Sequence, residues 1–104
     1  MSEAEIFKAL ADPTRRAVFE RLADGDRNAT ELRDGLDISQ PAMSQHLAVL
    51  RSAGLVAEER SGRNVNYRVN PEGLAHMDRW LRRYQNFWPQ RVEALKRLLK
   101  EMDQ

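Results

Sequence analysis

The spacing of apolar residues changes from a helical period to a strand period between residues 39 and 70. The apolar positions are Met43, Leu47 and Leu50 in the first part and Val65, Tyr67 and Val69 in the second. A spacing of i, i+4 and i+7 indicates a helix with one buried face, whereas strict alternation indicates a half-buried strand. Ser39 is a good N-cap, and Gly54 follows where such a helix would end. The sequence therefore predicts a helix over about residues 39–53 and a β-hairpin over about 55–70, which turns at Ser61-Gly62-Arg63.

Three shorter helical segments precede this region. Ile6, Phe7 and Leu10 recur at helical spacing and predict a first short helix. Asp12 is followed by proline, which is typical of a helix start, so we expect a second helix to about residue 22. Asn28 is followed three residues later by Glu31, the spacing of a capping box, and predicts a third helix that ends near residue 35.

The C-terminal third is predicted to be helical. Asn70-Pro71-Glu72 repeats the signal of a cap followed by proline. The apolar seam that follows consists of Leu74, Met77, Leu81, Tyr84 and Trp88, and it continues with Leu95, Leu98 and Met102. We expect a kink or a break into two helices near Pro89. The aromatic residues of the seam, with Trp80 and Phe87, either line an effector pocket or pack in a dimer interface. Interface packing is favoured, because so wide an apolar stripe on a small chain has to be buried against something.

Composition excludes several classes of protein. The 104 residues suit one mainly helical domain, residues 1–104, with a small β-hairpin. The chain has no cysteine, which excludes disulfides, thiolate metal sites and cysteine nucleophiles. It also has no apolar run of about 20 residues and no signal peptide at its start, so we expect a cytoplasmic protein. The net charge of +1 does not indicate nucleic-acid binding by itself. Positive charge is nevertheless concentrated at Arg51, Arg60, Arg63 and Arg68.

Two short helices joined by a tight turn and followed by a hairpin predict a winged helix-turn-helix. The residues off the buried stripe near the start of the second helix include Gln40, Ser44, Gln45 and His46. Glutamine can form two hydrogen bonds to adenine, and serine can bind bases or phosphate. In this motif the first residues of the second helix contact the base edges. Arg63 and Asn64, beside Gly62 at the tip of the wing, suit a phosphate or minor-groove contact.

Nearly the whole chain resembles the ArsR/SmtB family of bacterial winged-helix repressors. The segments that carry the resemblance are LADPTRRAVFERLADG (10–25), ATELRDGLDISQPAMSQHLAVLRSAGLV (29–56) and ERSGRNVNYRVNP (59–71). The resemblance implies a homodimer formed by the terminal helices, a palindromic DNA operator and repression that an effector relieves. It assigns base reading to Gln40, Ser44, Gln45 and His46 and a wing contact to Arg63. The predicted dimer interface comprises Ile6, Phe7, Leu10, Leu74, Met77, Leu81, Tyr84 and Trp88.

The metal-binding positions of the family do not carry over to this chain. A position that is cysteine in the family's thiolate site is Asn28 here. The positions of the second site, on the last helix, are Pro71, Gly73, Tyr84 and Phe87. None of these side chains suits zinc, and neither histidine, His46 or His76, has a second ligand at helical spacing. The sequence therefore predicts a regulator that does not respond to metals and has no cofactor.

Two other functions compete with DNA binding as interpretations of the sequence. A winged helix can serve as a protein-interaction module without DNA binding, and the near-neutral charge favours that alternative, but the polar face of residues 40–46 argues against it. An enzyme is disfavoured, because the chain lacks a nucleophile with an activating base and a Gly-rich phosphate loop. Arg15 and Arg16 fit a phosphate contact and a solvated face equally well.

Overall fold

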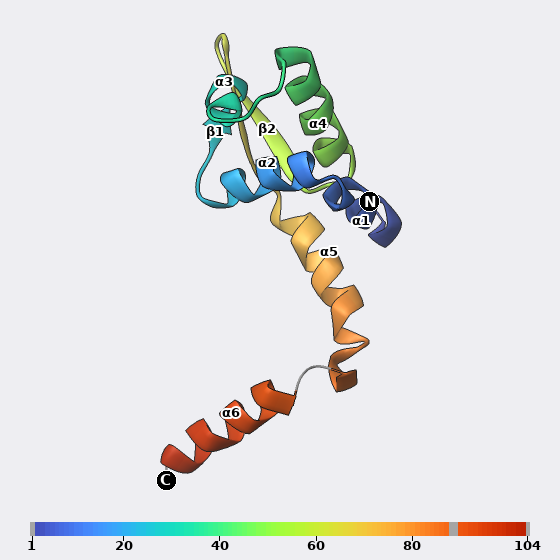
Figure 1. Ribbon diagram of the computed structural model, residues 1–104, viewed down its shortest axis with the longest axis vertical. Coiled ribbons are helices and arrows are strands. Elements are labelled where there is room, and N and C mark those ends of the chain that lie inside the picture. Colours follow the sequence, from blue (N-terminus) through green and yellow to red (C-terminus); the bar gives the residue numbers. More distant parts are fainter. Residues whose placement is uncertain (1, 88–89, 104) are drawn as a thin grey trace.

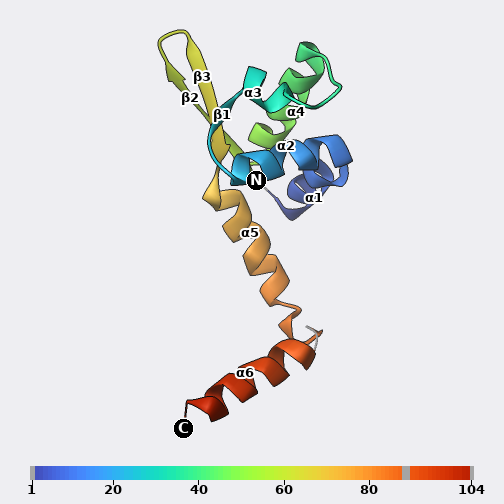
Figure 2. The same cartoon turned by 60° about the vertical axis from the view of Figure 1, so that its left-hand side comes forward.

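The computed structural model describes residues 2–87 and 90–103 (Figure 1). The elements in chain order are α1 (Glu3–Ala11), α2 (Pro13–Ala23), β1 (Arg27–Asn28), α3 (Ala29–Arg33), α4 (Gln40–Ser52), β2 (Val56–Ser61), β3 (Asn64–Val69), α5 (Pro71–Arg82), η1 (Gln85–Phe87) and α6 (Gln90–Met102). Helices α1 to α4 and the small sheet form one body, and α5 leads away from it (Figures 1 and 2). The predicted fold class, mainly helical with a β-hairpin, is confirmed. Within the described residues no helix is long and apolar enough to cross a membrane.

Side-chain caps begin the helices of the body, as the sequence predicts. The backbone N–H of Arg15 donates to Asp12 at the start of α2, at 2.9 Å. Asn28 and Glu31 form both halves of a capping box on α3, with hydrogen bonds of 2.8 and 3.0 Å. Ser39 caps α4 in the same way. Each cap satisfies an N–H group that a helix start leaves without an intrahelical partner, so the chain direction is fixed at three successive turns.

The sheet has three antiparallel strands in the order β1-β3-β2. The β2–β3 hairpin pairs Ser61 with Asn64, so its turn consists of Gly62 and Arg63. Gly62 has a φ of +63°, a conformation that glycine adopts without steric cost. Strand β1, which pairs Asn28 with Asn66, was not predicted from the sequence. A strand of two residues is too short to show an alternating pattern, and its second residue is also the cap of α3.

The core lies where the first four helices meet the base of the hairpin. It comprises Ile6, Ala9, Val18, Leu22, Leu32, Met43, Leu47, Leu50, Ala53, Leu55 and Val56. The predicted buried stripe of α4, Met43, Leu47 and Leu50, is confirmed. The assignment of Ile6 to the dimer interface is corrected. Its exposed fraction is 0% within a single chain, so it has no surface left to contact a partner. The first helix needs this anchor because its opposite side faces away from the core.

Arginine side chains bind the carbonyl groups at helix ends. Arg15 donates to the carbonyl of Ala9 at 2.6 Å, and Arg16 donates to that of Leu10 at 3.0 Å. Both contacts close the last turn of α1, where carbonyl groups lack intrahelical partners. Arg21 donates in the same way to the carbonyl of Leu32, at 3.1 Å. For Arg15 and Arg16, the structure therefore shows a role in the fold that neither sequence alternative included.

Helix α5 leaves the body through a close backbone contact. Gly54 ends the turn after α4 with a φ of +81°, and Gly73 in α5 packs against its carbonyl. Further along, Trp80 meets Phe7 of α1 edge-on, with ring centroids 4.9 Å apart. The predicted seam is interrupted earlier than expected, because α5 ends at Arg82 and a separate helix begins at residue 90. Trp88 and Pro89 lie outside the described residues.

The contact at Gly73 generates a stability prediction. A Cβ at this position would lie 2.4 Å from the Gly54 carbonyl oxygen, which is backbone and cannot move aside cheaply. We expect Gly73→Ala to lower the free energy of unfolding by about 1–3 kcal/mol. Helix propensity alone would raise it by about 1 kcal/mol. Ala75→Gly, at an exposed position of the same helix, is the control and should cost about 1 kcal/mol. Urea denaturation measures both, and a Gly73→Ala variant more stable than the parent would contradict the contact.

Candidate nucleic-acid interface

Three of the four predicted base-reading residues share an exposed surface at the start of α4. Gln40, Ser44 and Gln45 are all exposed, and at 100° per residue they lie on the side opposite or flanking the buried stripe. They occupy the first two turns of the helix, whose N-terminus Ser39 caps. Gln40 is also within 3.4 Å of the Arg33 guanidinium, which ties it to α3. The surface therefore offers hydrogen-bonding side chains on a rigid helix.

His46 lies apart from these three residues. It is half-buried, whereas they are exposed, and it lies close enough to Asp12, the cap of α2, for its charge to act on that carboxyl. The backbone N–H of Arg15 holds the pKa of the Asp12 carboxyl below its ordinary value of 3.8, and the charges of Arg15 and His46 act in the same direction. The imidazole therefore lies near the cap of α2, at the edge of the polar surface.

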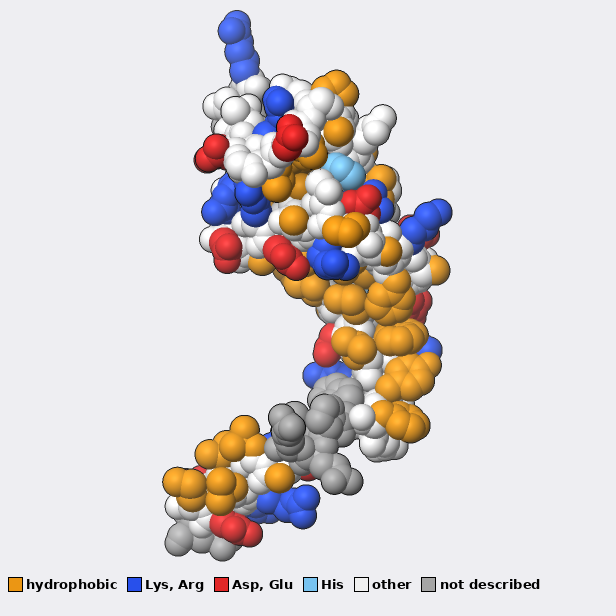
Figure 3. All heavy atoms as spheres, in the orientation of Figure 1, with side chains coloured by type: hydrophobic (Ala, Val, Ile, Leu, Met, Phe, Trp, Pro, Cys, Tyr) orange, Lys and Arg blue, Asp and Glu red, His pale blue; other side chains and the backbone are white. Residues whose placement is uncertain are grey.

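The tip of the hairpin presents Arg63 and Asn64. Both are exposed, and they follow directly on Gly62 in the two-residue turn and the first position of β3. Figure 3 shows a basic side chain that projects from this tip beyond the rest of the body. The hairpin thus carries a positive charge away from the helices, to a distance at which it can reach a separate part of a large ligand.

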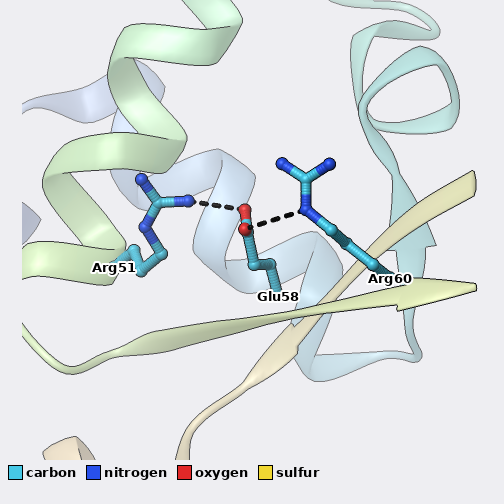
Figure 4. Close-up of polar contacts among 3 residues, drawn as sticks. All are labelled: Arg51, Glu58 and Arg60. Atoms are coloured by element: carbon cyan, nitrogen blue, oxygen red, sulfur yellow. Dashed lines mark hydrogen bonds and ion pairs between the residues drawn. The ribbon is translucent and has the colours of Figure 1, made fainter.

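Two of the four concentrated arginines are paired with one carboxylate. Arg51 of α4 contacts Glu58 of β2 at 2.5 Å, and Arg60 lies 3.7 Å from the other oxygen of the same carboxylate (Figure 4). The sequence predicted these arginines to be local positive charge, and the role of Glu58 was not predicted. The signal was present, because residues two apart on a strand share a face. Less free positive charge therefore faces solvent than the arginine count suggests.

Apolar side chains cover one side of α5 and one side of α6 (Figure 3). The exposed members include Phe7 of α1, Leu74, Leu81 and Tyr84 at or just beyond α5, and Leu95, Leu98, Leu99 and Met102 of α6. Leu10 and Met77, also assigned to the interface, are partly buried against the core. Every side chain from residue 93 to 102 is exposed, so this described part of α6 is not buried within the single chain. The predicted interface residues thus lie at the surface, except Ile6, and Trp88 is outside the described residues.

Two aromatic residues of the C-terminal third pack against each other and against α1. Trp80 packs between Phe7 and Tyr84, with its centroid 4.8 Å from that of Tyr84. Phe87 is exposed. The two pockets described in this structure, of about 540 and 340 Å³, are lined by other residues. Among the described residues, no group of three or more histidine and acidic side chains is placed to hold a metal ion.

Two helices joined by a turn, with an exposed polar face on the second and a β-hairpin beside it, define a winged helix-turn-helix protein. The helix-turn-helix domain family matches residues 10–59. The HTH-type transcriptional repressor SmtB of Mycobacterium tuberculosis is 47% identical over 73 residues, 70% of this chain and 54% of that protein. The chain thus spans about half the length of this relative.

Two solved structures share the fold over most of their length. An ArsR family transcriptional regulator has a TM-score of 0.73 at 32% identity. The match covers 85% of this chain and 96% of that regulator. A homodimeric winged helix-turn-helix DNA-binding domain from Mycobacterium bovis has a TM-score of 0.64 at 28% identity. The match covers 80% of this chain and 77% of that domain. The chain belongs to the ArsR/SmtB family of winged helix-turn-helix transcriptional regulators, a family of regulators and not of enzymes.

The cap at Asp12 generates a prediction about acid stability. The folded pKa of Asp12 lies below the unfolded value of 3.8, so its stabilisation is full above that value and is lost as the pH falls through the folded pKa. Asparagine caps a helix as well as aspartate does but does not titrate. We expect Asp12→Asn to lose less stability than the parent between about pH 5 and pH 3 in urea denaturation. Asp37→Asn, in an exposed loop, is the control, and an equal change in both variants would contradict a special role for Asp12.

Proposed function

We propose that this chain is a homodimeric repressor that binds a palindromic DNA operator and does not respond to metal ions. The observation that carries the proposal is the exposed face of Gln40, Ser44 and Gln45 on a capped helix beside a basic wing tip. Membership of the ArsR/SmtB family supports it, and so does the name of the related repressor SmtB.

Base reading is assigned to the first two turns of α4. The major groove of B-DNA is wide enough to admit an α-helix, and glutamine side chains can form paired hydrogen bonds with adenine. Gln40, Ser44 and Gln45 contact base edges in this proposal, and His46 contacts the groove edge, because it lies on the flank of the helix. Arg63 and Asn64 at the wing tip contact phosphates or the adjacent minor groove.

Dimerisation is assigned to the exposed apolar residues of α1, α5 and α6. Leaving Leu81 and Tyr84 in water is unfavourable, and burial against the same residues of a second copy removes their apolar area from solvent. A two-fold axis places two copies of α4 at related sites, which matches a palindrome with half-sites about 34–36 Å apart or a multiple of that distance. The homodimeric neighbour of known structure supports this arrangement.

Insensitivity to metals is proposed from the residue types at the metal positions of the family. Asn28 forms the capping box of α3, and Gly73 packs against the Gly54 carbonyl, so both positions have structural roles here. The cysteine-free sequence provides no thiolate. An organic effector, a protein effector and regulation by abundance alone are all compatible with this part of the proposal.

Selection of duplexes from a random pool tests DNA binding. We expect enrichment of a dyad-symmetric sequence, and a pool without one would contradict the proposal. On the selected duplex, Gln45→Ala should cost about 1–3 kcal/mol and relax the base preference at one position in each half-site. Arg63→Ala should weaken binding to all sequences. It should also reduce the slope of log affinity against log salt concentration by the amount that corresponds to about one phosphate contact. Arg97→Ala, on the polar face of α6, removes the same charge and should leave both measurements unchanged.

Sedimentation equilibrium tests the dimer interface. Leu81 is 42% exposed in the single chain, and Leu81→Glu would place a charge in the proposed interface. We expect this variant to be a monomer at micromolar concentration, because an unpaired buried charge strongly disfavours association. Val49 on α4 is 39% exposed, and Val49→Glu is the matched control that should remain dimeric. A monomeric parent, or a dimeric Leu81→Glu variant, would exclude this interface.

A further inference from the structure

Glu58 joins the candidate base-reading helix to the wing. Its carboxylate lies between the guanidinium groups of Arg51, from the last turns of α4, and Arg60, from the same strand (Figure 4). The Glu58 side chain is only 24% exposed, whereas that of Arg60 is 74% exposed. One half-buried carboxylate therefore binds two arginines, of which Arg51 is about half exposed and Arg60 is largely exposed, so both remain accessible from solvent.

The bridge lies along the same side of α4 as part of the polar surface. Arg51 follows Gln40 by eleven residues, which brings the helix back to within about 20° of the same side, and Ser44 lies on that side between them. Arg60 shares a face of β2 with Glu58. The carboxylate therefore occupies the corner between α4 and the wing. When α4 enters a major groove and the wing reaches the adjacent backbone, this corner faces the phosphates between them.

A carboxylate in that corner opposes phosphate binding in two ways. It repels the phosphate directly, and it engages the two guanidinium groups that would otherwise neutralise the phosphate. Arginine contacts to phosphate are independent of sequence and dominate non-specific affinity. An element that weakens the unwanted complex raises specificity without any additional contact to the correct one.

We propose that Glu58 is a specificity-determining residue that restrains Arg51 and Arg60 from binding phosphates of non-operator DNA. On the operator, base contacts from Gln40 and Gln45 hold α4 in the groove, and the two arginines stay with Glu58. On other sequences those base contacts are missing, so binding depends on phosphate contacts, which the carboxylate withholds by retaining the arginines. This inference rests on the proposed DNA binding and adds to it how non-operator DNA is rejected.

Glu58→Gln tests the proposal, because it keeps the shape of the side chain and removes its charge. Binding is measured on a random-sequence duplex and on the selected operator, over a range of salt concentrations. We expect affinity for the random duplex to rise about two- to fivefold at physiological salt. Its salt dependence should steepen by about 0.9 in log–log slope for each arginine released. Affinity for the operator should change less, so the ratio of operator to random binding falls.

Glu59→Gln is the matched control. Glu59 is the next residue of β2, lies on the opposite face of the strand and is exposed, and the described residues include no ion pair to it. The Glu59→Gln substitution therefore makes the same change in net charge as Glu58→Gln without releasing an arginine. Equal gains in the two variants would overturn the proposal, because net charge alone would explain them. The double variant Arg51→Gln/Glu58→Gln should lose part of the gain, and a full gain there would also contradict the bridge.

Weaker operator binding by Glu58→Gln with unchanged random binding would overturn the restraint, because it would show that Glu58 only positions the wing. Thermal melting of each variant verifies that the fold is intact. A parent protein without salt-dependent binding to either duplex would instead reject the proposed function, which keeps the two failures distinguishable.

Discussion

The backbone contact between Gly54 and Gly73 determines how the parts of this molecule are joined. Gly54 ends the turn after α4, the N–H of Asn70 donates to the carbonyl of Leu55 at 2.9 Å, and α5 begins at the next residue. The end of the candidate reading helix, the base of the wing and the start of the candidate dimerisation helix thus meet within a few residues. Because interiors are close-packed, a side chain at Gly73 would displace all three. The distance between two α4 helices in a dimer depends on this junction.

Much of the fold could be predicted from the sequence, because its signals are local. The caps at Asp12, Asn28 and Ser39 and the apolar spacing of α4 each depend on residues within one or two turns. The end of α5 at Arg82 could not be predicted in this way, because the apolar spacing continues past it. The burial of Ile6 was also missed, since helical spacing cannot tell a face that packs on the same chain from one that packs on a partner.

The candidate site also combines features that the sequence predicts with features that only the folded chain shows. The exposed positions of Gln40, Ser44 and Gln45 follow from the buried stripe of α4, which the sequence reveals. The partners of the arginine side chains do not follow from the sequence, because they depend on which helix end or carboxylate lies nearby in space. Arg15, Arg21 and Arg51 all have partners that only the folded chain brings close. A count of basic residues therefore overestimates the number of arginine side chains that are free to contact a nucleic acid.

Asn28 takes part in two structures at once. Its side chain caps α3, and its backbone belongs to β1, which pairs with Asn66 in the wing. One residue therefore ties the first helix of the helix-turn-helix to the hairpin, and neither can shift along its axis without changing the geometry of the other. Helix α3 and the hairpin are therefore coupled mechanically through Asn28, which lies four residues before the core residue Leu32.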